Sequence, residues 1–358
     1  MENITLANVE SFVDLPGPDL SDFLLPQELP SALTKLFTAS YIIIMAVALT
    51  GNLLVMVVIL SNKFMRTITN LFLVSLAISD MFIAAWNMPL QLMYYLKNEW
   101  TLGEPLCKFT SYFQTVNIVA SIVTLAAVAI ERYYAICHPL RARYVRTTRR
   151  AIVALVSFWI FAFLISLPQV WIQRIGLRLV IQMDQIPQIR IAYICEEYFS
   201  KIEYDFVYTY ILFIVLYLIP MVIMFLAYGR IGYKLWLRKP IGDSKSSPQV
   251  VQRSLKQKRR IIKMLVTVVV IFCLCWLPFF AIQFYHLYHK LTDEYRIVMA
   301  VFHLLGYSNS FFNPIIYGFM NENFKSSVKL LIQKCCRRQP RPPVHPFTTT
   351  AEIVMYNV

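Results

Sequence analysis

Charged and polar side chains fall inside long apolar stretches of this 358-residue chain, where they are costly and indicate function. Asp80 stands among apolar neighbours, and Glu131 and Arg132 adjoin at the end of another apolar stretch. An acid beside an arginine forms an ion pair that protonation or a partner can break. The alternative is that Arg132 only extends its guanidinium to the membrane surface, but an arginine in that role needs no neighbouring acid. The pair therefore predicts a two-state element.

Asp80 is expected to meet polar groups from other apolar stretches, namely Asn52, Ser121, Asn309 and Asn313. Carboxylate, hydroxyl and amide oxygens together can bind a small cation or order a water cluster. The same groups can also form a structural hydrogen-bond network without an ion. The residue types leave both interpretations open.

Seven apolar stretches must position these side chains. They span residues 36–61, 70–95, 109–137, 151–171, 204–228, 261–288 and 297–319. Each has the roughly 20 residues that a helix needs to cross a bilayer. Because lipid offers no hydrogen-bond partners to the backbone, each stretch is expected to be a helix, in which the backbone groups pair with one another. The chain is 58% hydrophobic and 15% charged, against about 25% charge in soluble domains. The pattern predicts an all-α fold, a seven-transmembrane helix bundle.

The remaining residues divide into short segments around this bundle. We expect an extracellular tail at 1–35, the bundle at 36–319, an amphipathic eighth helix at 320–334 and a cytoplasmic tail at 335–358. In the eighth helix, Phe324, Val328 and Leu331 fall on one face, with Lys325 opposite, as in helices that lie on a membrane surface.

Charge predicts the orientation. Lysine and arginine concentrate in alternate links and in the last tail, and basic links face the cytoplasm. This predicts a multi-pass plasma-membrane protein with its N-terminus extracellular. The net charge of +14 then belongs to the inner face, where it suits membrane lipid and a cytosolic partner rather than nucleic acid. The acidic outer face favours a cationic ligand, although any single acid there is usually a solvated loop residue.

Three features predict covalent modification. Cys107 and Cys195 are the only cysteines on the outer side, so a disulfide between them is expected. The adjacent Cys335 and Cys336 follow the amphipathic segment and are palmitoylation candidates, with free thiols as the alternative. Asn3 begins an Asn-Ile-Thr triplet, a glycosylation acceptor on the outer tail.

Catalysis and transport are disfavoured by what the stretches contain. They hold no His-x-x-x-His or Gly-x-Ser-x-Gly pattern, so the protein is not expected to be an enzyme. A transporter or channel is the rival class, but it would have paired halves with repeated broken helices and charges along a path. Only Asp80 is a central charge.

Taken in order, these residues resemble the rhodopsin-like (class A) G-protein-coupled receptors over about residues 38–336. The resemblance is carried by Asn52, Asp80, Glu131-Arg132-Tyr133, Trp159, Pro220, the run from Phe272 to Pro278, the run from Asn313 to Tyr317, and the Cys107–Cys195 pair. Prolines at 89, 168, 220, 278 and 314 suit helices that pivot.

The resemblance implies roles for these residues. Asp80, Ser121, Asn309 and Asn313 look like a sodium pocket, so Na⁺ is expected as an allosteric ion and no other cofactor. The switch residues and G-protein contacts would be Glu131, Arg132, Tyr133, Tyr228, Phe272, Trp276, Asn313, Pro314 and Tyr317. The partners implied are a heterotrimeric G protein of the Gq or Gi class and arrestin. Lys258 stands where some members place an acid that locks Arg132, so another contact must hold the inactive state.

The ligand is predicted from Gln114, which occupies the position of the aspartate of amine receptors. Here the chain is similar to neuropeptide receptors. Residues 228–236 and 318–324 are most similar to receptors for RFamide peptides (pyroglutamylated RFamide peptide and neuropeptide FF), whereas 64–70 and 134–140 are similar to orexin and cholecystokinin receptors. A C-terminally amidated Arg-Phe peptide is therefore expected, with an orexin- or cholecystokinin-like peptide as the alternative.

A binding pose follows from the chemistry of that peptide. Glu196 or Glu197 would pair with the guanidinium, and Gln114 would donate to and accept from the carboxamide. Aromatic rings would enclose the phenylalanine. The full set of expected ligand contacts is Gln91, Gln114, Glu196, Glu197, Trp276, Phe279, Phe280, Gln283, His286, His303 and Tyr307.

Overall fold

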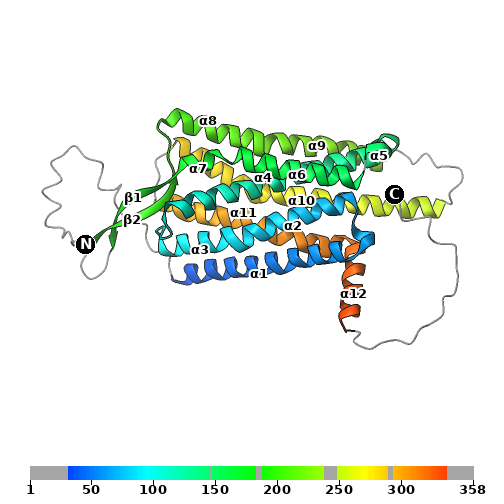
Figure 1. Cartoon of the computed structure of the whole chain (residues 1–358), viewed down its shortest axis with the longest axis horizontal. Helices are drawn as coiled ribbons and strands as arrows, with labels where there is room; N and C mark the ends of the chain where they lie inside the picture. The colour runs from blue at the N-terminus through cyan, green and yellow to red at the C-terminus, as the bar shows by residue number, and fades with distance from the viewer. Residues whose placement is uncertain (1–30, 146, 183–187, 238–247, 289–292, 337–358) are drawn as a thin grey trace.

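Long helices lie side by side along one axis of the computed structural model (Figure 1). The structure describes residues 31–145, 147–182, 188–237, 248–288 and 293–336. A β-hairpin extends from one end of the bundle and a short helix, α12, lies across the other (Figure 1). We refer to these as the hairpin end and the α12 end.

The bundle is built mostly from α-helices with short irregular turns. The α-helices are α1 (Ser31–Ser61), α2 (Ile68–Phe82), α3 (Met88–Lys97), α4 (Gly103–Cys137), α5 (Pro139–Val145), α6 (Thr148–Ile165), α7 (Pro168–Ile172), α8 (Ile202–Leu212), α9 (Ile219–Gly232), α10 (Pro248–Tyr288), α11 (Asp293–Met320) and α12 (Glu322–Cys336). The turn η4 (Lys63–Met65) is a 3₁₀ helix, and η5 (Ile83–Asn87), η6 (Phe213–Leu218) and η7 (Tyr233–Leu237) are π-helical.

Six helical segments of the described chain are long and apolar enough to cross a membrane. They are Ser31–Ser61, Ile68–Lys97, Gly103–Cys137, Thr148–Ile172, Glu203–Trp236 and Leu255–Tyr288. The seventh predicted stretch, 297–319, is the 28-residue helix α11, which packs against α1 and α10. Its polar residues are turned inward, and Asn309, Ser310 and Asn313 are buried. The predicted all-α bundle is confirmed.

Prolines explain where the helices change geometry. Pro89 and Pro220 each stand one residue after the first residue of a helix that follows a π-helical segment, η5 or η6. Because proline lacks a backbone N–H and its ring crowds the preceding turn, that turn widens. Pro168 separates α6 from α7, while Pro278 and Pro314 lie inside α10 and α11.

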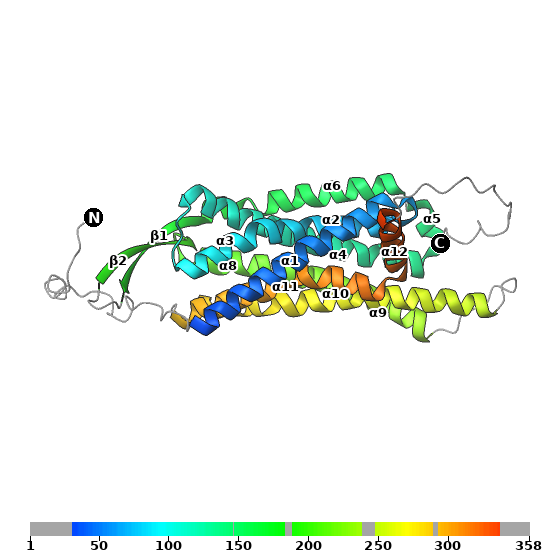
Figure 2. The same ribbon diagram turned by 90° about the horizontal axis from the view of Figure 1, so that it is seen from below.

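The long helix α4 runs through the middle of the bundle (Figure 2). It contacts α2, α6 and α9 along its length and β1 at the hairpin end. Helix α10 is longer than the predicted stretch and begins at Pro248, because its basic first turns are good helix formers although they cannot lie in lipid.

The hairpin consists of antiparallel strands β1 (Gln173–Gln182) and β2 (Gln188–Glu197). It adds a small sheet that the helical prediction did not include. The predicted disulfide joins Cys107 at the start of α4 to Cys195 in β2. A second anchor is Trp100, whose backbone N–H donates to the Tyr193 carbonyl (2.7 Å). The hairpin is therefore fixed above the bundle interior.

The predicted amphipathic helix corresponds to α12, which buries Phe324 and exposes Lys329. The side-chain amide of Asn62 donates to the Ser327 hydroxyl (3.2 Å) and ties α12 to the first link. Asn3 lies outside the described residues, as do the side chains of Cys335 and Cys336.

Candidate functional site

A cavity of about 640 Å³ opens at the hairpin end of the bundle. Helices α3, α4, α8, α10 and α11 and strand β2 all contribute to its wall. Most residues predicted to contact a ligand line it: Gln91, Gln114, Glu196, Glu197, Phe279, Phe280, Gln283, His286 and His303. Trp276 and Tyr307 are outside this lining and are buried in the core.

Gln114 is oriented by Tyr307. The Tyr307 hydroxyl donates to the Gln114 side-chain carbonyl oxygen Oε1 (2.8 Å). Tyr307 is fully buried, whereas Gln114 lines the cavity, so the bond connects the core to the cavity wall. The bond uses one of the two lone pairs of Oε1 and leaves the Nε2 donor for a ligand, so Gln114 keeps the expected ability both to donate and to accept.

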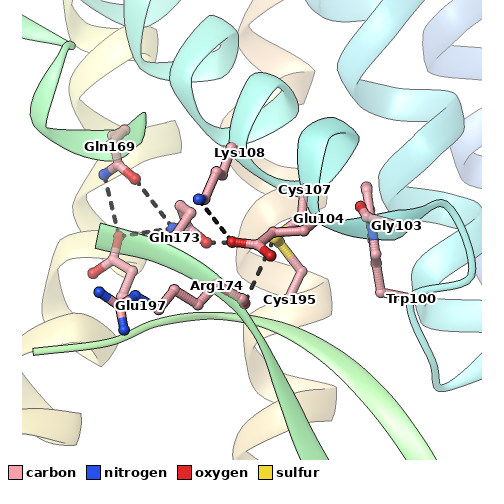
Figure 3. Close-up of a disulfide and its surroundings, with 10 residues drawn as sticks. All are labelled: Trp100, Gly103, Glu104, Cys107, Lys108, Gln169, Gln173, Arg174, Cys195 and Glu197. Atoms are coloured by element: carbon pink, nitrogen blue, oxygen red, sulfur yellow. Dashed lines mark hydrogen bonds and ion pairs between the residues drawn. A yellow bond between two sulfur atoms is a disulfide. The ribbon is translucent and has the colours of Figure 1, made fainter. Parts of the chain in front are cut away.

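Glu197 is held by two glutamine side chains (Figure 3). The amides of Gln169 (3.2 Å) and Gln173 (3.4 Å) both donate to its Oε1, and Gln169 also donates to the Tyr208 hydroxyl (2.9 Å). Among the described residues, nothing donates to the second oxygen, Oε2. Glu197 is thus a fixed acceptor at the cavity wall, with one oxygen available to a ligand.

The surroundings of Glu197 change its acidity. Enclosure by the protein raises the pKa of Glu197 above its ordinary value; the bond from Gln169 lowers it, and the negative charge of Asp205 raises it. The side chain is nevertheless exposed to the cavity, so water in the cavity still solvates the carboxylate and we infer that it remains charged at neutral pH.

Asp205, Gln169 and Gln173 also line the cavity but were not among the predicted site residues. Asp205 accepts a hydrogen bond from the Thr209 hydroxyl (3.3 Å). Asp205 could have been predicted as a candidate, because it is one of the acidic residues on the outer side and stands at the start of the fifth apolar stretch. The described lining contains Glu196, Glu197 and Asp205 but no lysine or arginine, so the cavity is electrostatically suited to a cation.

An aromatic layer lies directly below the cavity. Trp276 makes an edge contact with Phe279 (ring centroids 5.9 Å apart) and lies 6.4 Å from Phe272. Gly306 of α11 faces the indole: a Cβ atom at this glycine would lie 3.0 Å from Trp276 Cζ3. The absence of a side chain at Gly306 thus allows Trp276 to pack directly against α11.

Asp80 is fully buried and bonded to α11. Its Oδ1 accepts from the Ser310 hydroxyl and its Oδ2 from the Asn313 amide, both at 2.8 Å. Ser310 was not predicted here. Asn52, which was expected to meet Asp80, donates instead to the Ser310 carbonyl (3.0 Å).

Several oxygens of the predicted cation site lack protein donors. Ser121 Oγ, Asn309 Oδ1 and Asn313 Oδ1 are buried without a hydrogen-bond partner. Oxygens of this kind fit a hard cation such as Na⁺, which binds oxygen ligands. The part of the chain that the structure describes has no group of three or more His, Cys, Asp or Glu residues able to hold a metal ion, so any ion here would rely on neutral oxygens around one carboxylate.

At the α12 end, Arg132 pairs with Glu131 (Nε to Oε2, 2.7 Å). The Thr69 hydroxyl donates to the same Glu131 oxygen (3.0 Å). Both charged side chains are largely buried, 17% and 9% exposed. Tyr133 lies within hydrogen-bonding distance of His138 (3.1 Å). Lys258 is exposed, in keeping with the expected absence of a lock between Arg132 and an acid on the sixth helix.

The sequence of this chain matches a family of known proteins. Residues 51–317 match the family described as 7 transmembrane receptor (rhodopsin family). The mouse pyroglutamylated RF-amide peptide receptor is 33% identical over 325 residues, covering 88% of this chain and 74% of that receptor. A QRFP-like peptide receptor from Branchiostoma floridae is 33% identical over 86% of this chain. The rabbit neuromedin-K receptor is 34% identical over 86% of this chain and 63% of its own length.

The close approach of Gly306 to Trp276 gives a stability prediction. We expect Gly306→Ala to displace the indole and cost about 1–3 kcal/mol, seen as a lower apparent melting temperature of the purified protein in detergent. Gly318→Ala is the matched control in the same helix, because no atom lies within 4 Å of its added Cβ. Equal melting temperatures for the two variants would contradict the packing argument.

Proposed function

The chain belongs to the rhodopsin family of seven-transmembrane receptors, and from that membership we propose that it is a neuropeptide receptor whose ligand ends in Arg-Phe-amide. The observation that carries the ligand class is the charge of the cavity, whose described lining includes Glu196, Glu197 and Asp205 and no basic residue other than histidine. The relatives named for RF-amide and QRFP-like peptides support it.

The proposed pose uses the fixed geometry of the wall. The ligand guanidinium pairs with Glu197, whose Oε1 is already held by Gln169 and Gln173. The Gln114 amide donates to the oxygen of the terminal carboxamide. The phenylalanine ring lies against Phe279 and Phe280, whose own rings are in edge contact (5.8 Å).

Orientation and coupling belong to the same proposal. The hairpin end faces the extracellular medium, where a disulfide such as Cys107–Cys195 persists. The α12 end faces the cytosol, where the Arg132–Glu131 pair opens to a heterotrimeric G protein of the Gq or Gi class. Arrestin and anionic lipid are further partners of this face. Glycosylation at Asn3 and palmitoylation at Cys335 and Cys336 remain part of the proposal.

Sodium is proposed as an allosteric ion of the resting state. Asp80, Ser121, Asn309 and Asn313 would hold it, because their buried oxygens include three without a protein donor. The ion would offset the buried carboxylate charge. Asp80 would then be released to rearrange with α11 when the ion leaves.

Charge at Glu197 should govern recognition of the basic peptide. We expect Glu197→Gln to weaken a peptide ending in Arg-Phe-amide by about 10- to 100-fold, the value of a charge-assisted hydrogen bond. Potency is measured as guanine-nucleotide exchange on Gq and Gi proteins in reconstituted vesicles. Glu104→Gln is the control, since Glu104 pairs with Lys108 outside the cavity (2.7 Å).

Peptides of the alternative classes belong in the same assay. Orexin, cholecystokinin-like and neuromedin-K peptides run beside the amidated Arg-Phe peptide and its free acid. Full activation by one of the other peptides, with no response to the amidated Arg-Phe peptide, would overturn the ligand class. Ion flux without exchange would favour a channel.

The raised pKa of Glu197 gives a pH dependence with a definite sign. A carboxyl group is charged above its pKa, so affinity for the cationic peptide is complete at neutral pH and falls as pH decreases through the raised value. The fall should begin at a higher pH than for an ordinary glutamate, about 4.3. Binding is measured from pH 7.5 downward in wild type and in Glu197→Gln. The part of the fall that comes from Glu197 should be present in wild type and absent from the variant.

Sodium should oppose activation through Asp80. We expect NaCl to weaken agonist binding relative to choline chloride at equal ionic strength, because the ion stabilises the resting state. Asp80→Asn should remove the difference between the salts, since the variant lacks the charge that attracts the cation. A sodium effect that persists in Asp80→Asn would contradict this site.

A further inference from the structure

Arg260 fastens the α12 end of α10 to two other helices. Its guanidinium donates to two carbonyl oxygens at the end of α11, those of Met320 (Nε, 2.8 Å) and Phe319 (Nη2, 3.3 Å). The same Nη2 lies 2.5 Å from Oε1 of Glu322 in the first turn of α12. One side chain thus bridges α10, the last turn of α11 and the start of α12.

These acceptors suit an arginine. The last carbonyls of a helix lack intrahelical partners and carry the negative end of its dipole. The guanidinium presents several donors in a fixed plane, so it can bond carbonyls and a carboxylate together, which a lysine ammonium does less well. Because Arg260 and Glu322 are 42% and 57% exposed, their ion pair alone is weak. The combined set of contacts is what holds α10.

The neighbouring residues do not provide another restraint in this direction. Lys258 is exposed and cannot pair with Arg132. Arg259 points to the other side of α10, where it donates to the Leu235 carbonyl (Nε, 3.0 Å) and lies over the Trp236 ring (5.4 Å). At the α12 end of the described bundle, Arg260 therefore makes polar contacts from α10 to both α11 and α12; the polar contact between Cys275 and Ser308 joins α10 to α11 farther along the helices (3.5 Å).

We propose that Arg260, Glu322 and the terminal carbonyls of α11 form a latch that holds α10 in the resting position and must break before a G protein enters. The latch takes the place of the contact that Lys258 cannot make. The latch does not depend on the identity of the ligand. Of the two experiments below, only the second relies on the proposed coupling to a G protein.

The first experiment needs neither ligand nor G protein. Spin labels on unnatural amino acids at Lys256 and Lys329, both exposed, report the distance between α10 and α12 in the full-length protein in nanodiscs. We expect Arg260→Gln to add a longer-distance population, and Arg260→Lys to give a smaller one. Lys258→Gln removes the same charge from an exposed position and should leave the distribution unchanged.

The second experiment measures signalling. Basal guanine-nucleotide exchange per folded receptor should rise about three- to tenfold in Arg260→Gln and should also rise in Glu322→Gln. Because the two residues act in one contact, the rise in the double variant should be smaller than the product of the two single rises. An unchanged distance distribution in Arg260→Gln, or the same change in Lys258→Gln, would overturn the latch. A longer distance with reduced exchange would support the latch and assign Arg260 a second role as a G-protein contact, while leaving the ligand proposal unaffected.

Discussion

The inability of hydrocarbon to accept or donate hydrogen bonds governs the whole arrangement. Large apolar side chains such as Phe225 and Leu274 are exposed on the outside of the bundle, while Asn52 and Asp80 are completely buried. Polar groups on α1, α2 and α11 therefore find partners inside the bundle, in one another or in their own backbone. This explains why α11, with its many polar residues, is held by Asn52 and Asp80 rather than by apolar packing alone.

Polar groups that line the cavity are not subject to that constraint, because the cavity opens beneath the hairpin and not toward lipid. The hairpin is fixed to α4 by the disulfide and by Trp100, so Glu197 is carried to a defined place in the wall. Glutamines from α7 and β1 then set its carboxylate. The site thus combines a flexible type of element, a loop, with contacts that remove its freedom, which is how binding geometry is usually made specific.

Much of this was predictable from the residue sequence. The lengths of the apolar stretches predicted the bundle, and the two outer cysteines predicted the disulfide. Ser310 was missed, although it stands three residues before Asn313 and so shares a helix face with it. Asp205 and Gln169 could not be placed, because the hairpin fold decides which outer residues converge. The orientation of the Gln114 amide depends on the Tyr307 hydroxyl, 193 positions away, which no local pattern indicates.

The π-helical segment η5 has a consequence for comparing this chain with its relatives. It holds an extra residue between Asp80 and Gln91, on a helix whose ordinary turn rotates by about 100° per residue. A homologue with one residue fewer here would form an unbroken α-helix, and its outer half would be turned by that angle. Gln91 and Tyr94, which now line the cavity, would face a different neighbour. Aligning this chain with such a homologue would require a single-residue gap within 83–87, and that one deletion would change the cavity wall without any substitution in it.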